Sequence, residues 1–240
     1  LLMIEDEEAS LTRLRRAVDD YRTEAKPPFS HYAYYQLGTA LSLLASLTEE
    51  PSAAADAIEA LNAALHSGAH NDSGKAMLER CVGDAYAHVC NWPAAASHLA
   101  ISLTLHSHPV TKILLGTAHL NLGALDLTRA VIGDIDRATL DNAAQTDLAI
   151  LEARLAIAAE DLPLAGKADQ CLAALVIKSP YFRSLRERLR NELRLLIDSK
   201  APVISNLQKS RQPEPRSLRE RVDDWGSLGI RMASAAASIL

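Results

Sequence analysis

Apolar side chains recur along the chain at intervals of three and four residues, which places them on one face of an α-helix. Across residues 1–26 the recurring positions are Leu11, Leu14, Ala17, Val18 and Tyr21. Pro27 and Pro28 end this first predicted helix, because a proline lacks the backbone N–H and restricts the residue before it.

The same spacing predicts a series of further helices joined by short connections. Gly, Asn and Ser mark residues 67–74 as a loop between two of them. No segment shows the strict alternation of a β-strand, and short loops between helices are typical of antiparallel hairpins packed side by side. The predicted helices cover residues 30–47, 52–66, 75–90, 94–107, 110–122, 126–137, 142–159, 163–177 and 181–198.

The composition supports an all-α fold. Aromatic residues make up 4% of the chain and glycines only 10 of its 240 residues, whereas Ala and Leu, both strong helix formers, dominate. A β-sandwich or barrel would carry more aromatic and β-branched residues and more turn glycines. Hydrophobic residues, at 48%, are numerous enough for a sizeable core and exclude wholesale disorder.

The hairpins repeat along the chain. Gly83 and Gly116 stand in the related contexts 82–86 (Val-Gly-Asp-Ala-Tyr) and 115–119 (Leu-Gly-Thr-Ala-His), and we call the distance between them the repeat interval. Each glycine is followed seven residues later by a turn, at Cys90 and at Gly123. Weaker copies begin near residues 34–38 and 151–156. A fixed period of this length indicates a repeat architecture.

The pattern resembles the tetratricopeptide repeat, a helix–turn–helix unit of about 34 residues, over roughly residues 31–180. In the best copy, Val82-Gly83 stand where the family has Leu-Gly, and the family's Tyr, Ala, Phe and Pro positions hold Tyr86, Ala95, Leu99 and Pro109. The resemblance implies an α-α superhelix, a right-handed solenoid of antiparallel helix pairs with a concave groove.

In that family the groove is lined by the first helix of each pair. The family members that hold chaperone C-terminal tails carry Lys, Asn and Arg there, and this chain departs from that clamp, so no chaperone-tail binding is expected. The register implied by the resemblance gives the candidate partner-binding residues as Tyr35, Thr39, Arg80, Asp84, His88, Thr117, Asn121, Ile150 and Arg154.

Local signals place the turns and ends of this predicted domain. Asn91 and Asp161 are positioned to cap the second helix of a pair, with Pro93 and Pro163 in its first turn. Residues 1–198 form the predicted repeat domain. Its end caps are expected to be the acidic helix at 1–26 and the Arg-rich helix at 181–198.

A linker and a final helix are predicted beyond the repeat. Residues 199–216 are rich in Pro and Ser, as linkers are. Residues 217–240 form a predicted amphipathic helix, which either docks back on the repeat or serves as a detachable recognition or oligomerisation element. Its apolar stripe comprises Leu218, Val222, Trp225, Met232 and Ala236.

Charge and cysteine content restrict the partners and the compartment. The net charge is −5, and the basic section 181–221, with 11 Lys/Arg against 5 Asp/Glu, is interpreted as a solvated Arg-rich face rather than a nucleic-acid site. Three cysteines cannot all pair and form no CxxC, which favours a reducing compartment, the cytoplasm. No apolar run reaches membrane-spanning length, and the acidic residues after Ile4 do not suit a secretory signal.

Catalytic chemistry finds little support in the sequence. No histidine or cysteine pair has zinc-site spacing, and no nucleophile or phosphate-binding motif is present. Asp84 and His88 lie four residues apart on one helix face, which suits an acid–histidine pair or an ordinary surface hydrogen bond. The sequence therefore predicts no catalytic residue, no metal and no cofactor.

Three functions remain as hypotheses. The first is a non-enzymatic scaffold that binds a protein or peptide partner in the groove. The second is a sensory or regulatory module of a larger protein, which couples ligand binding to the 199–240 segment. The third is an all-helical hydrolase that uses Asp84 and His88. The sequence does not identify the partner or the oligomeric state.

Overall fold

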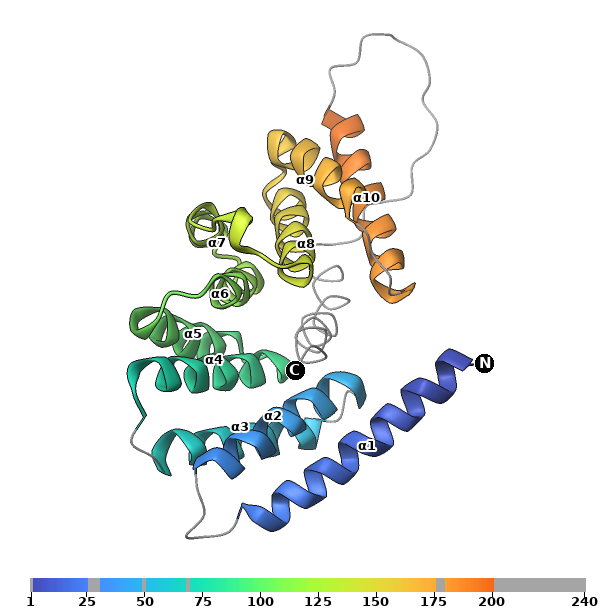
Figure 1. Cartoon of the computed structure of the whole chain (residues 1–240). Helices are drawn as coiled ribbons and strands as arrows, with labels where there is room; N and C mark the ends of the chain where they lie inside the picture. The colour runs from blue at the N-terminus through green and yellow to red at the C-terminus, as the bar shows by residue number, and fades with distance from the viewer. Residues whose placement is uncertain (1, 26–30, 49–50, 68–69, 176–179, 201–240) are drawn as a thin grey trace, which may run out of the picture.

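The computed structural model describes residues 2–25, 31–48, 51–67, 70–175 and 180–200, and these residues are almost entirely helical (Figure 1). No β-strand occurs within these ranges, so the all-α prediction is confirmed. The helices are α1 (Leu2–Glu24), α2 (His31–Thr48), α3 (Pro51–Ser67), α4 (Asp72–His88), α5 (Trp92–Leu105), α6 (Pro109–Asn121), α7 (Leu125–Gly133), the 3₁₀ turn η1 (Arg137–Thr139), α8 (Asn142–Ala159), α9 (Leu162–Ala174) and α10 (Pro180–Lys200).

Several helix boundaries differ from the predicted ones, and capping accounts for two of the differences. Helix α4 begins inside the predicted loop 67–74, because the Asn71 Oδ1 atom accepts a hydrogen bond from the Gly74 N–H at 2.8 Å and starts the helix early. The helix predicted over 126–137 ends at Gly133. Asp136 then caps the separate turn η1 by accepting from the Ala138 N–H at 3.0 Å.

Helix α10 also runs past the end of the predicted helix 181–198. Helix α10 continues to Lys200, so the first two residues of the predicted 199–216 linker are helical. The rest of that linker and the predicted helix 217–240 lie outside the described residues.

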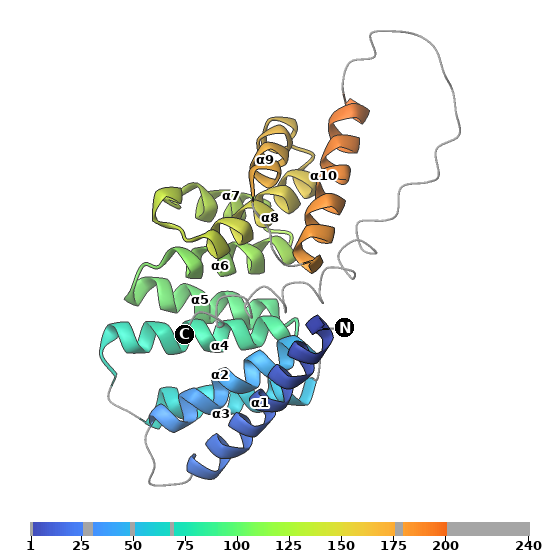
Figure 2. The ribbon, with the colours of Figure 1, turned by 45° about the vertical axis from the view of Figure 1, so that its right-hand side comes forward.

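Successive helices pack against one another along the chain, and the views in Figures 1 and 2 agree on this stacking. In addition, α2 contacts α4, α4 contacts α6, α6 contacts α8, and α8 contacts α10. This packing is consistent with a helical repeat, in which the even-numbered helices share one layer. The right-handed superhelical solenoid stays a prediction.

The core is a chain of four overlapping clusters rather than one centre. The first joins α1 to α4 around Leu41 and Leu61, and the second joins α4 to α7 around Leu99. The third joins α6 to α8, and the last joins α8 to α10. Each cluster shares a helix with the next, as expected when a hairpin covers its apolar face with its neighbour.

Glycines mark the closest approaches between helices. A Cβ built on Gly83 would lie 2.7 Å from the Leu99 side chain of α5, and one on Gly116 would lie 2.9 Å from the Leu151 side chain of α8. Gly38 has the same relation to Leu61 of α3, at 2.5 Å. Only a residue without a side chain leaves room for these leucines.

The turns after α4, α6 and α8 share one backbone feature. A residue close after each of these helices has a positive φ, which is 56° at Cys90, 74° at Gly123 and 51° at Glu160. The predicted caps after two of these turns are confirmed. Asn91 Oδ1 accepts from the Ala94 N–H at 3.3 Å, and Asp161 Oδ1 accepts from the Leu164 N–H at 3.1 Å.

Polar contacts fix the pairing of α4 with α5. The buried Glu79 carboxylate lies 2.7 Å from His98 Nδ1, and the His98 ring stacks on Tyr86 with a centroid separation of 5.3 Å. The Ser102 hydroxyl donates to the Ala76 carbonyl oxygen at 2.7 Å. These groups are satisfied across the hairpin, so burying them costs little.

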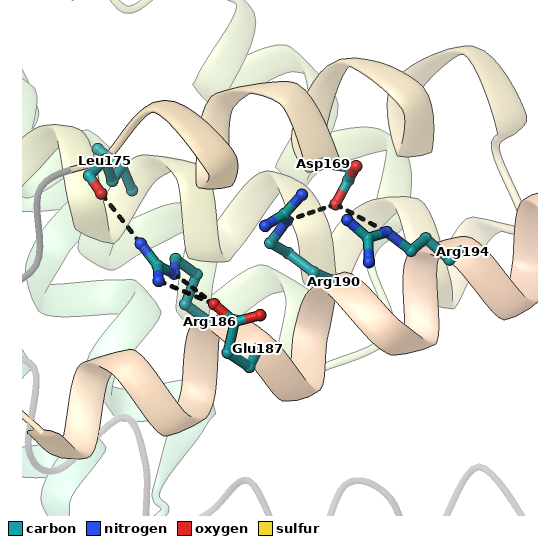
Figure 3. A network of polar contacts seen from close by, with 6 residues as sticks. All are labelled: Asp169, Leu175, Arg186, Glu187, Arg190 and Arg194. Carbon is teal, nitrogen blue, oxygen red and sulfur yellow. Dashed lines mark hydrogen bonds and ion pairs between the residues drawn. The ribbon is translucent and has the colours of Figure 1, made fainter.

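Helix α10 docks on α8 and α9 through both apolar and charged contacts. Leu189 and Leu193 are fully buried in the last core cluster. Figure 3 shows the charged edge, where Arg190 Nε donates to Asp169 Oδ1 at 2.7 Å and Arg186 Nη1 donates to the Leu175 carbonyl oxygen at 3.1 Å. These two arginines thus tie α10 to the C-terminal end of α9 and to a point within that helix.

Candidate partner-binding face

The even-numbered helices form one face of the stack, because each contacts the next even-numbered helix. The predicted groove residues all lie on α2, α4, α6 and α8. His88, Asn121 and Arg154 follow one another at the repeat interval and lie on α4, α6 and α8. We call this surface, formed by α2, α4, α6 and α8, the even-helix face.

Two of the predicted residues bridge neighbouring helices of this face. Arg154 Nη2 donates to Asn121 Oδ1 at 3.2 Å, which ties α8 to α6. Asn121 in turn donates from Nδ2 to the Thr117 carbonyl oxygen at 2.8 Å. Burial of Arg154, which is 8% exposed, lowers its pKa to about 10, so it is still charged at neutral pH. This guanidinium serves the packing of the stack.

Asp84 and His88 also come together on this face, since they lie one turn apart on α4. His88 Nε2 is 3.6 Å from Asp84 Oδ2, too long for a hydrogen bond. The His88 side chain is buried, and neither ring nitrogen has a hydrogen-bond partner among the described residues. Burying a ring nitrogen that has no hydrogen-bond partner costs free energy of folding, unless another group supplies the hydrogen bond.

A second acidic group, Asp147 on α8, belongs to the same region. Burial, together with the negative charges of Asp141 and Asp84, raises the pKa of Asp147 to about 7. Sequence reasoning missed this residue. The repeat offers a signal, because Cys81, Leu114 and Asp147 are also separated by the repeat interval, and a carboxylate is out of place in such an apolar series.

The first hollow in the even-helix face lies between α2 and α4 and has a volume of about 300 Å³. Tyr35 forms part of its wall, and burial raises the pKa of that phenol. Tyr32 and Met77, which sequence reasoning missed, are 61% and 37% exposed at its rim. The hollow is lined by Tyr32, Tyr35, His70, Asn71, Gly74, Met77 and Leu78.

A second hollow, of about 200 Å³, adjoins the first because Met77 lines both. Arg80 and His108 face it from α4 and from the start of α6. Burial first, and then the charges of Arg80 and His106, lower the pKa of His108, which keeps that ring neutral at pH 7. This hollow is lined by Ser73, Ala76, Met77, Arg80, Ser102, His106, His108 and Thr111.

The remaining predicted residues do not reach either hollow. The hydroxyls of Thr39 and Thr117 donate to the carbonyl oxygens of Tyr35 and Ile113 in their own helices, at 2.8 Å and 3.0 Å. Ile150 is 1% exposed and packs in the core cluster shared with α10. The structure therefore separates the predicted set into hollow-lining, bridging and packing residues.

One thiol, that of Cys81, lies on the even-helix face, in α4. Burial raises the pKa of the Cys81 thiol to about 11, so this cysteine next to Arg80 and Asp84 is a neutral, weakly nucleophilic thiol at pH 7. Within the described ranges, no three His, Cys, Asp or Glu side chains converge in a metal-binding arrangement. None of the described helices is long and apolar enough to cross a membrane.

A larger hollow, of about 450 Å³, lies away from this face between α7, α8 and α9. Its charges are mostly engaged with one another. Arg129 pairs with Asp161 at 3.3 Å, and Arg137 pairs with the buried Glu152. The hydrogen bond to Glu152 raises the pKa of Arg137. Because these pairs join neighbouring elements, we interpret this hollow as part of the packing.

Comparison with known proteins leaves the repeat resemblance as a prediction. No family model matches the chain, and neither a curated protein nor a solved structure is significantly similar to it. The case for function therefore rests on the geometry of the even-helix face.

Proposed function

We propose that this protein is a non-enzymatic interaction scaffold that binds a peptide or a partner helix on its even-helix face. The observation that supports the proposal most strongly is the pair of adjoining hollows that share Met77 and extend over α2, α4 and α6. An extended peptide needs pockets for alternate side chains, and a helix needs a groove for its anchors. Two adjoining hollows meet either need.

The residues at these hollows have the chemistry of binding anchors. Tyr and Arg are enriched among the residues that dominate interface energies, and Met adapts its shape to a partner. Tyr32, Tyr35 and Met77 offer apolar area, while Arg80 supplies a charge and five N–H donors between them and α6. The binding energy of the proposed scaffold therefore comes from these four residues.

A tetratricopeptide-like repeat and a cytoplasmic location are part of the proposal. Two observations support the repeat. Gly83 and Gly116 stand in related contexts one repeat interval apart, and a residue with positive φ follows each of α4, α6 and α8. The cysteines Cys81, Cys90 and Cys171 are all free thiols, which suits a reducing compartment. Neither statement is needed for binding on the even-helix face.

A test begins with selection of binding peptides from a random display library against the full chain. The selected peptides are then measured against Met77→Glu, Arg80→Glu and the control Ile101→Glu, since Ile101 is 39% exposed on α5 and lines neither hollow. We expect at least about tenfold weaker binding for both face variants, because each anchor contributes more than about 1.4 kcal/mol. The control is expected to bind as the parent does.

The proposal fails if the face variants keep their helical content and their urea midpoint and still bind every selected peptide as tightly as the parent. It also fails if Ile101→Glu alone abolishes binding, because the contact surface would then include the odd-numbered helices.

A further inference from the structure

The second hollow of the even-helix face brings hydrogen-bond donors together without a carboxylate. Ser73, Met77 and Arg80 line it from one side of α4, where their spacing places them on a single helix face. Among the described residues, no Asp or Glu lines this hollow. The larger hollow beside α7 differs, because Arg129 and Arg137 pair there with carboxylates of the same wall. A cationic wall without a carboxylate has the chemistry of an anion site.

Arg80 is the cation of this wall, and it is partly buried. The two carboxylates nearest to it along α4 face histidines instead. Glu79 lies 2.7 Å from His98 Nδ1, and Asp84 Oδ2 lies 3.6 Å from His88 Nε2. Within the part of the chain that the structure describes, no carboxylate forms an ion pair with Arg80. Its fork of N–H donors is therefore available to an anionic ligand.

Thr111 gives a second, independent sign of a ligand. Its side chain is 1% exposed and lines the hollow, and its hydroxyl has no hydrogen-bond partner among the described residues. Leaving a buried hydroxyl unpaired costs free energy, which a bound acceptor would recover. Thr111 also stands in the first turn of α6, before the first backbone bond of that helix, from the Lys112 N–H to the His108 carbonyl oxygen at 3.2 Å. Negative charge is favoured at such a helix start.

Two further donors complete the wall. His108 Nδ1 accepts from the Val110 N–H at 3.3 Å, so the proton of the neutral ring is on Nε2, which is a donor. Ser73 adds a second hydroxyl from the exposed start of α4. A carboxylate offers two acceptor oxygens, whereas a phosphoryl group offers three and carries more charge. The oxyanion that uses a guanidinium, two hydroxyls and an imidazole N–H most fully is therefore a phosphoryl group.

We infer that the second hollow receives the phosphoryl group of a phosphorylated serine or threonine in the partner peptide. Arg80, Thr111 and His108 hold its oxygens. An apolar side chain of the same peptide occupies the first hollow, which adjoins the second at Met77. This inference rests on the proposed function and specifies the class of peptide that the scaffold binds.

The test uses the full chain and three peptide libraries that differ only in a fixed central residue, which is phosphoserine, serine or glutamate. Peptides enriched from the first library are synthesised in all three forms, and their dissociation constants are measured by fluorescence anisotropy. We expect the phosphoserine form to bind at least about tenfold more tightly than the serine form, because its hydrogen bonds involve charged groups. The glutamate form is expected to bind much more weakly than the phosphoserine form.

Matched variants assign this preference to the second hollow. Arg80→Gln removes the guanidinium and is expected to abolish the preference for phosphoserine. Arg16→Gln makes the same change on the exposed surface of α1 and is expected to keep it. Thr111→Val keeps the shape of the side chain and removes the unpaired hydroxyl. It should therefore weaken the preference without lowering the urea midpoint of the free chain.

Three results overturn the inference. One is equal binding of the phosphoserine and serine forms by the parent, and another is a preference that survives Arg80→Gln in a chain with parental helical content. The third is a glutamate form as tight as the phosphoserine form, because the hollow would then be a carboxylate site. A lower urea midpoint of Thr111→Val would also count against it, since the hydroxyl would then be bonded within the free chain.

The two proposals fail in different ways. If unphosphorylated peptides bind the parent and are lost with Met77→Glu, while phosphorylation does not tighten them, the inference is wrong and the scaffold function stands. If the folded chain binds neither phosphorylated nor unphosphorylated peptides, the scaffold function itself is wrong.

Discussion

Replacement of Gly83 by alanine gives the sharpest test of how the helix pairs are packed. Its added Cβ would lie 2.7 Å from Leu99 Cγ and 3.1 Å from the Ala95 carbonyl oxygen. Leu99 is 1% exposed within the core, and the Ala95 oxygen belongs to the backbone of α5. Relief therefore requires α4 and α5 to move apart.

The magnitude follows from two opposing effects. Alanine in place of glycine inside a helix stabilises by about 1 kcal/mol through propensity, whereas overpacking a well-packed site costs about 1–3 kcal/mol. The first contact is well under 3 Å, so we expect a cost toward the upper end of that range. The net effect of Gly83→Ala is then a destabilisation of about 1–2 kcal/mol, the difference between the overpacking cost and the propensity gain.

The matched control is Gly166→Ala in α9, where a Cβ would meet no heavy atom within 4 Å. Gly166→Ala gains helix propensity without any overpacking, so it is expected to stabilise the fold by about 1 kcal/mol. Urea unfolding followed by circular dichroism at 222 nm should separate the two variants by about 2–3 kcal/mol. Equal stability of the two would refute the close-approach argument, because propensity alone would then account for both.

Three further predictions concern the turns, the acidic cluster and the last helix. Glu160→Gly relieves a left-handed φ of 51° and should stabilise by about 0.5–1 kcal/mol, whereas Gly123→Ala, at φ 74°, should destabilise similarly in urea titrations. Because the pKa of Asp147 is raised to about 7, the folded chain keeps a proton that the unfolded chain loses near pH 4. The free energy of unfolding should therefore fall between pH 4 and 7, by at most about 4 kcal/mol. The variant Asp147→Asn should remove that fall. A stability difference between parent and variant that does not change with pH would contradict this. Leu189→Ala should cost about 2–5 kcal/mol and Leu195→Ala, at a site 67% exposed, less than about 0.5 kcal/mol, both read from urea midpoints.

Local sequence signals predicted much of the fold because they act within one or two turns of helix. Apolar spacing gave the helices, and the caps at Asn91 and Asp161 were predicted from residue type and position alone. The early end of α7 at Gly133 was missed, because the side chain of Asp136 caps the separate turn η1 and apolar spacing does not reveal that cap.

The candidate site was less accessible to sequence reasoning, because it depends on which helices meet. Asn121 and Arg154 stand one repeat interval apart in the sequence, but their hydrogen bond and the burial of Arg154 come from packing. Tyr32 of α2 and Met77 of α4 form the rim of the first hollow only because packing brings α2 and α4 into contact, although α3 separates them in the sequence. The raised pKa of Asp147 arises from burial and from charges on two helices, which periodicity does not encode.

The most direct measurement is site-specific photo-crosslinking of the full chain in cells that express it. A benzophenone amino acid is placed at Tyr32, 61% exposed on the even-helix face, or at Leu127, 53% exposed on α7. The account predicts one discrete cross-linked partner protein from position 32, lost with Arg80→Glu, and none from position 127. A partner captured only from position 127, or captured from position 32 regardless of Arg80, would contradict binding on the even-helix face.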